Sequence, residues 1–284
     1  MSDLFAALLL GIIEGITEFL PISSTGHLLI AQHWLGKRSD LFNIAIQAGA
    51  ILAVVVIYRQ RLLGLLLAFA GRDASAPYDP LGVDITPAQW RTYAYKLGFA
   101  FGITAVMGLL AKQLGFQLPE TVTPIAWALI IGAAWMLVAE HWAARRALVL
   151  GERTHITWTA AFMVGLAQVV AGVFPGTSRS AATIFVALLV GVTNRAAATE
   201  FAFLVGIPTM FAATAYELME VVGTPAASNE DWAALGVAFV ASGVTAFAAV
   251  KWLLGYIQSN RFTAFAWYRV ALGSALLLLL PAGD

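Results

Sequence analysis

The sequence predicts an all-α polytopic membrane protein, and three observations carry this prediction. Of its 284 residues, 60% are hydrophobic and only 11% are charged, whereas a typical soluble domain has about 25% charged residues. Apolar stretches near the roughly 20 residues that cross a bilayer as a helix recur along the whole chain. Two of the apolar regions are interrupted by polar, proline-containing breaks. We expect one integral membrane domain over residues 1–284.

Composition also excludes several classes of protein. The formal net charge is zero, so the chain lacks the basic field of a nucleic-acid-binding protein, and we expect no nucleic acid as a partner. There is no cysteine, which excludes disulfides, thiolate catalysis and cysteine metal sites. The N-terminus lacks a basic segment and a small-residue cleavage site, and we interpret it as mature sequence.

The first apolar region, about residues 4–35, is interrupted at 21–26, and a second, about 158–192, is interrupted at 175–180. We expect each to form a re-entrant helical hairpin. The arm that follows Ser24 has only about a dozen residues before a basic loop, too few to cross at 1.5 Å per residue. The remaining apolar stretches predict six membrane spans, at about 41–58, 92–111, 123–142, 197–219, 232–255 and 263–281.

The two breaks resemble each other, which indicates an internal repeat. Aligning Gly11 with Gly165 also pairs Glu14 with Gln168, Pro21 with Pro175, Ser23 with Thr177, Ser24 with Ser178 and Thr25 with Arg179. A hairpin plus three spans crosses the membrane an odd number of times. Repeat two, about 155–284, must therefore be inverted relative to repeat one, about 1–145. The breaks would enter from opposite faces and meet near the midplane.

The lysine and arginine residues of the loops predict the orientation, because cytoplasmic loops are enriched in them. One side has Lys37, Arg38 and Lys112, and the other has Arg59, Arg61, Arg72, Arg91, Arg145, Arg146, Arg153, Arg195, Lys251 and Arg261. We expect the richer side, with a long loop at 71–90, to be cytoplasmic. Both termini and the mouth of the first hairpin would then face the periplasm or exterior of a bacterial inner membrane.

The first break places polar groups where a membrane protein rarely tolerates them. Pro21 ends one helix, and Ser23, Ser24 and Thr25 are residues that cap another, whose free N–H groups would form an anion site. Glu14 and Glu18, four residues apart, share a helical face. They could bind a divalent cation, Mg²⁺ or Ca²⁺, that bridges phosphate oxygens, or one could accept a proton; the structural alternative is a pair of hydrogen-bonded carboxylates.

Ser24 and His27 are close enough at a helix start to serve as a hydroxyl nucleophile and an imidazole proton carrier. The structural alternative is a capping serine and a buried histidine. In the second break, Arg179 suits bidentate phosphate binding, or alternatively a salt bridge to Glu14 or Glu18. Arg269 is interpreted as a structural ion-pair residue, with Glu200 and Glu217 as candidate partners. The expected substrate-binding residues are Ser23, Thr25, Gly26, Thr177, Ser178 and Ser180.

These residues resemble the undecaprenyl-diphosphate phosphatase family, integral membrane phosphatases linked to bacitracin resistance. The resemblance is carried by residues 14–27, EGITEFLPISSTGH, and 175–180, PGTSRS, and is supported by 46–53, 200–208 and 268–269. The chain departs from the family pattern at Ala181, commonly glycine, and Asn43, often acidic.

The resemblance implies removal of the terminal phosphate of undecaprenyl diphosphate, which regenerates the carrier for cell-wall glycan synthesis at the outer face of the membrane. It implies a site of Glu14, Glu18, Ser24, His27 and Arg179, with Ser24, His27 or water as the attacking group. The expected partners are the polyprenyl diphosphate and membrane lipids, with a homodimer left open. The rival class is a polyprenyl-phosphate transporter or flippase, since inverted repeats with broken helices are typical of transporters. A purely structural scaffold would leave the buried charges unexplained.

Overall fold

The computed structural model describes residues 3–72, 86–116, 121–221 and 230–279, and within these ranges it is all-helical. Residues 73–85 of the long loop expected at 71–90 lie outside the described parts. The helices are α1 (Asp3–Thr17), α2 (Ser24–Leu35), α3 (Asp40–Phe69), α4 (Pro87–Gln113), α5 (Val122–Leu150), α6 (Trp158–Val173), α7 (Arg179–Leu189), α8 (Arg195–Val221), α10 (Trp232–Ser259) and α11 (Thr263–Leu279).

Five of the helices in the described ranges are long and apolar enough to cross a membrane: α3, α4, α5, α8 and α10. Large apolar side chains such as Leu63, Ile131 and Val240 are exposed on them, as expected for surfaces that face lipid instead of water. The prediction of a multi-pass membrane protein is confirmed. The sixth predicted span, 263–281, corresponds to α11, whose 17 residues fall short of the usual spanning length.

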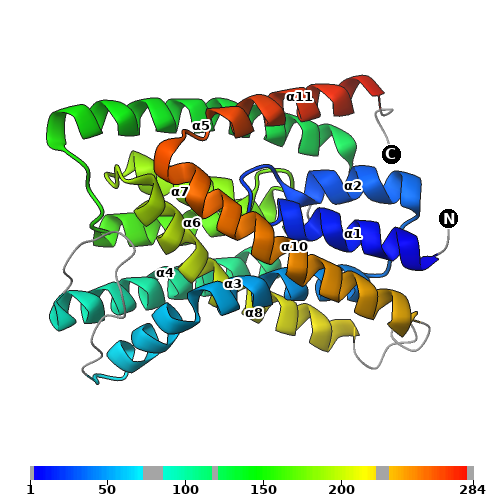
Figure 1. Cartoon of the computed structure of the whole chain (residues 1–284), viewed down its shortest axis with the longest axis horizontal. Helices are drawn as coiled ribbons and strands as arrows, with labels where there is room; N and C mark the ends of the chain where they lie inside the picture. Colours follow the sequence, from blue (N-terminus) through cyan, green and yellow to red (C-terminus); the bar gives the residue numbers. More distant parts are fainter. Residues whose placement is uncertain (1–2, 73–85, 117–120, 222–229, 280–284) are drawn as a thin grey trace.

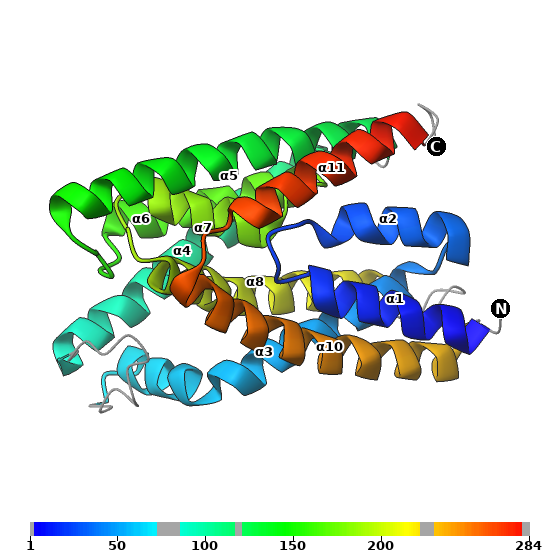
Figure 2. The same ribbon diagram turned by 45° about the horizontal axis from the view of Figure 1, so that its top comes forward.

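The two interrupted regions are helical hairpins. Their arms have 15 and 12 residues in α1 and α2, and 16 and 11 in α6 and α7, so each arm is shorter than the roughly 20 residues of a full crossing. Figure 1 shows α1 and α2 at the right end of the molecule and α6 and α7 at the left, and Figure 2 agrees. The hairpin tips meet in the middle.

Each hairpin packs closely against a helix from the other half of the chain, and a glycine lies at each contact. A Cβ added at Gly11 of α1 would lie 2.3 Å from the carbonyl oxygen of Ala238 in α10, and one at Gly165 of α6 would lie 2.5 Å from that of Ala100 in α4. Without a side chain at these positions, the helix backbones approach closely, as small residues commonly allow in membranes. The halves are therefore interlocked, and the tips sit at their junction.

Candidate active site

The hairpin tips have the same backbone at the point where the second arm begins. Ser23 and Ser178 are the N-caps of α2 and α7, with φ of 74° and 66°, and no other non-glycine residue in the described ranges has a positive φ. The predicted alignment, which paired Ser24 with Ser178, is thus wrong by one residue at the break. The first N–H groups of each helix have no intrahelical partner, so two anion-attracting helix starts lie at the junction.

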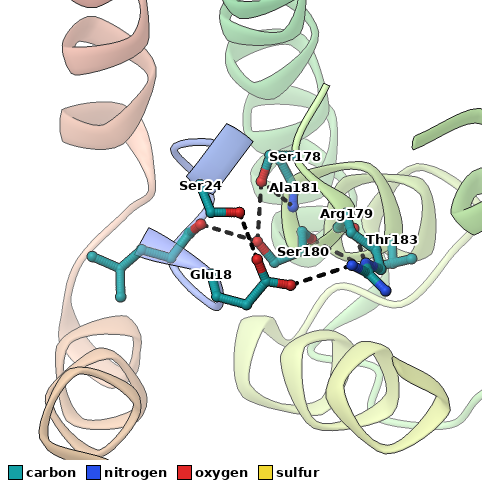
Figure 3. A network of polar contacts seen from close by, with 8 residues as sticks. Glu18, Ser24, Ser178, Arg179, Ser180, Ala181 and Thr183 are labelled. Atoms are coloured by element: carbon teal, nitrogen blue, oxygen red, sulfur yellow. Dashed lines mark hydrogen bonds and ion pairs between the residues drawn. The ribbon is translucent and has the colours of Figure 1, made fainter. Parts of the chain in front are cut away.

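Glu18 is the centre of the polar network at the junction, and Figure 3 shows it between the two hairpins. Its Oε2 accepts a hydrogen bond of 2.5 Å from the Ser24 hydroxyl. Its Oε1 lies 3.3 Å from Nη2 of Arg179, which reaches across from α7. The salt bridge that the sequence suggested as the structural alternative for Arg179 is present, with Glu18 as the partner. A carboxylate in contact with a hydroxyl and a guanidinium can accept a proton from the hydroxyl.

Glu14 lies one helical turn before Glu18 and is only 2% exposed. Among the described residues, none donates a hydrogen bond to its Oε2. A buried carboxylate oxygen without a donor is costly and fits a cation. The described ranges contain no group of three or more metal-ligating side chains.

The hydrogen-bond partners of His27 differ from the partner that the sequence predicted. Its Nδ1 lies 2.7 Å from the carbonyl oxygen of Ser23, and its Nε2 lies 2.6 Å from the hydroxyl of Tyr268 on α11. The Ser24 hydroxyl donates its hydrogen bond to Glu18 instead. The expected direct pairing of Ser24 with His27 is therefore not what the structure has, because both imidazole nitrogens are engaged by nearer partners.

The residues expected to bind substrate divide into two groups. The hydroxyl of Ser180 donates to the carbonyl oxygen of Leu20 at 3.1 Å, and Ser178 lies 3.1 Å from Ser180 and caps α7. These two serines fasten one tip to the other. Ser23 likewise caps α2 through the N–H of Gly26. Thr25 is exposed, and Thr177 is half-buried, so their hydroxyls are the more accessible ones.

Arg269 is the largest departure from the sequence prediction. It is fully buried, and its five N–H groups donate to five backbone carbonyls, those of Pro21, Gly176, Thr177, Ala128 and Leu129. The expected ion pair with Glu200 or Glu217 is therefore wrong for both carboxylates, because backbone carbonyls take every guanidinium N–H; Glu200 lies 3.1 Å from Arg61 instead. The guanidinium ties both hairpin tips to α5.

Glycines make this clamp possible. Gly176 has a φ of +89°, and a Cβ there would lie 2.7 Å from the carbonyl oxygen of Ile125. A Cβ at Gly132 would lie 2.1 Å from Nη2 of Arg269. In the sequence, the only signal was the position of Arg269 in an apolar span. Its partners are backbone carbonyls, which every residue has, so no side-chain pattern identifies them.

Comparison with known proteins covers nearly the whole chain. The family model described as bacitracin resistance protein BacA matches residues 7–275. Proteins named undecaprenyl-diphosphatase are similar over their full lengths. The one from Stenotrophomonas maltophilia (strain K279a) is 63% identical over 284 residues, which is 100% of both chains. That of Xanthomonas axonopodis pv. citri (strain 306) is 58% identical over 99% of both chains, and that of Rhizobium johnstonii is 61% identical over 99% of this chain and 98% of its own.

Proposed function

This chain belongs to the bacitracin resistance protein BacA family, and from that premise we propose that it hydrolyses undecaprenyl diphosphate to undecaprenyl phosphate and phosphate. The observation that carries the proposal is the contact of Glu18 with both Ser24 and Arg179, one from each hairpin. The reaction returns the lipid carrier to cell-wall glycan synthesis. The site lies between helix starts that attract anions, which suits a diphosphate group.

In the proposed mechanism Ser24 is the nucleophile. Its oxygen attacks the terminal phosphorus while Glu18 takes the hydroxyl proton, and the bond from phosphorus to the bridging oxygen breaks, so that undecaprenyl phosphate leaves. Water then hydrolyses the phosphoserine and restores the Ser24 hydroxyl. Arg179 and the free N–H groups of α2 and α7 bind the phosphoryl oxygens, where negative charge is concentrated.

The two carboxylates fit a divalent cation, Mg²⁺ or Ca²⁺. Glu14, with its unpartnered oxygen, and Glu18 would hold it, and the ion would supply electrostatic neutralisation of the diphosphate. Activity should fall to background after treatment with a strong chelator and return when Mg²⁺ or Ca²⁺ is added. Full turnover by rigorously metal-free enzyme would show that Glu14 does not act through a cation.

The decisive experiment for the function uses purified full-length protein in detergent with a polyprenyl diphosphate. Release of inorganic phosphate is expected, and its loss in Glu18→Gln would connect it to this site. One observation supports the rival function, a polyprenyl-phosphate transporter or flippase: the hairpins enter from opposite ends of the molecule, as in many transporters. Lipid movement across vesicles without phosphate release would support the transporter and contradict the phosphatase.

The orientation and symmetry are part of the same proposal. In both halves, 1–145 and 155–284, a hairpin precedes three helices, and the hairpins lie at opposite ends, which supports two inverted repeats in an inner-membrane protein. Both termini and the mouth of the first hairpin would face the periplasm. The chain has no native cysteine, so single cysteines report cleanly. We expect a cysteine at position 145 to be protected from an impermeant external reagent and one at position 229 to be labelled. Residue 229 lies outside the described ranges.

A further inference from the structure

Tyr268 and Arg269 are consecutive residues of α11, and both contact the hairpin tips. Arg269 holds backbone carbonyls of both breaks, whereas Tyr268 reaches a single side chain, His27 of α2. The two ring planes are nearly parallel, with an angle of 4° between them and 5.6 Å between their centroids, and the tyrosine oxygen lies 2.6 Å from Nε2. The proposed reaction gives Tyr268 no role.

The partners of His27 decide which nitrogen carries its proton. The carbonyl of Ser23 can only accept, so Nδ1, at 2.7 Å, must be the donor. In the neutral ring Nε2 is then the acceptor, and the Tyr268 hydroxyl donates to it. The Ser23 carbonyl thus sets the tautomer of the ring, and the tyrosine hydroxyl, which can donate or accept, fixes the orientation of the ring.

The carbonyl that His27 holds belongs to a residue with an unusual backbone. Ser23 has φ 74° and ψ 99°, a sparsely populated conformation that persists only where neighbouring contacts enforce it. The next residue, Ser24, places its hydroxyl 2.5 Å from Glu18. The Ser23 carbonyl belongs to the peptide that leads into Ser24, and it accepts from the His27 backbone N–H at 3.4 Å as well as from Nδ1 at 2.7 Å. The shorter contact therefore constrains the backbone from which the Ser24 side chain projects.

We propose that Tyr268 is a positioning residue: it holds His27, and His27 Nδ1–H holds the Ser23 carbonyl so that Ser24 points at Glu18. His27 acts on the reaction through the backbone of the nucleophile's neighbour, without receiving the proton of Ser24. The inference rests on the proposed role of Ser24 as nucleophile.

The first test separates the two nitrogens of His27. In His27→Asn the side-chain amide offers a donor near the place of Nδ1, whereas His27→Gln places its amide nearer to Nε2. We expect the Asn variant to retain at least about tenfold more turnover than the Gln variant, since one hydrogen bond is worth roughly that factor. If His27 were a proton carrier, both substitutions would remove the imidazole and cost the same turnover. Equal loss in both variants therefore overturns the proposal.

The second test removes only the tyrosine hydroxyl. Tyr268→Phe should lower kcat by about tenfold with little change in KM, and should have no further effect in the His27→Asn background. The matched control is Tyr95→Phe on α4, since Tyr95 is 42% exposed and Tyr268 is 44% exposed; its kinetics should be those of the parent. Losses that multiply in the double variant would instead indicate an independent role for Tyr268.

A third readout needs no activity. The chain has 4 histidines, so ¹⁵N NMR of ring-labelled protein can resolve His27. We expect a neutral ring with its proton on Nδ1, and an Nε2 signal that moves in Tyr268→Phe but not in Tyr95→Phe. A parent protein with the proton on Nε2 overturns the proposal. A parent protein that shows the expected signals but releases no phosphate contradicts the phosphatase function while keeping the contact.

Discussion

The two hairpins have the same architecture but different polar chemistry. Both have arms of similar length and an N-cap serine with positive φ. In the α1–α2 hairpin, Glu18 accepts a hydrogen bond from Ser24, and Glu14 lies one helical turn before Glu18. In the α6–α7 hairpin, Gln168 stands in place of Glu14 and donates to a neighbouring threonine of α4. Arg179 and Ser180 reach across the junction, to Glu18 and to the carbonyl oxygen of Leu20.

Under the proposed mechanism, this difference means that a broken helix at the junction does not by itself make a reactive site. The break supplies free N–H groups and a strained cap in both hairpins. The proposed reaction also requires a carboxylate that contacts a hydroxyl, and of the two hairpins, in the ranges that the structure describes, the first has this contact. The second hairpin contributes a positive charge and the support of the first.

The largest effect that would test this division is expected from Ser24→Ala. Removal of a nucleophile costs a factor of about 10⁴ or more in kcat, while substrate binding and thermal stability should change little, because the cap is Ser23 and not Ser24. In the second hairpin Ser178→Ala should cost about 0.5 to 2 kcal/mol of stability and far less turnover. Comparable kinetic losses in both variants would abolish the distinction; phosphate release and thermal unfolding measure the two effects.

Glu18→Gln should have the next largest effect. It preserves size but removes the proton acceptor of Ser24 and the negative partner of Arg179, so we expect kcat to fall by about 10² to 10⁴. Gln168→Ala in the second hairpin is the control, with an effect on kcat of a few-fold at most. A Glu18→Gln protein that is folded and nearly as active as the parent would rule out Glu18 as the base.

Arg179→Lys asks whether the second hairpin contributes only charge. Lysine retains the charge but lacks the planar fork that contacts two phosphate oxygens, so kcat/KM should fall by about tenfold to a hundredfold. Steady-state kinetics with a polyprenyl diphosphate measure this loss. A fully active lysine variant would indicate that a point charge is sufficient.

Gly132→Ala tests the element shared by both hairpins. The added methyl would displace the guanidinium of Arg269, and overpacking of this kind costs about 1 to 3 kcal/mol. Gly108→Ala on α4 is a matched control, because no atom lies within 4 Å of its added Cβ. Thermal unfolding in detergent should separate the two variants. Equal stability of both would mean that the clamp contributes little.

The sequence predicts the hairpins and the position of each break because each depends on local pattern, an interrupted apolar run and a proline. It offered the Glu18–Arg179 pair, 161 positions apart, as an alternative because a buried charge needs a partner of opposite sign. It fails where the partner is a backbone group or an uncharged side chain. Arg269 binds carbonyls contributed by three separate segments, and Tyr268 meets His27 across 241 positions. Neither contact has a spacing that could be read from one sequence. The cap register was missed because Ser23 and Ser24 are equally good capping residues.

The place of Arg269 in the chain has a consequence for biosynthesis. Membrane helices are synthesised in order from the N-terminus, and the residue that joins the two tips is number 269 of 284. Until α11 has left the ribosome, the carbonyls of both breaks lack the donor that unites them. The nascent protein therefore carries Glu14, Glu18, Ser24 and Arg179 before the contacts of Arg269 can form, and premature termination before α11 should yield inserted chains with little activity.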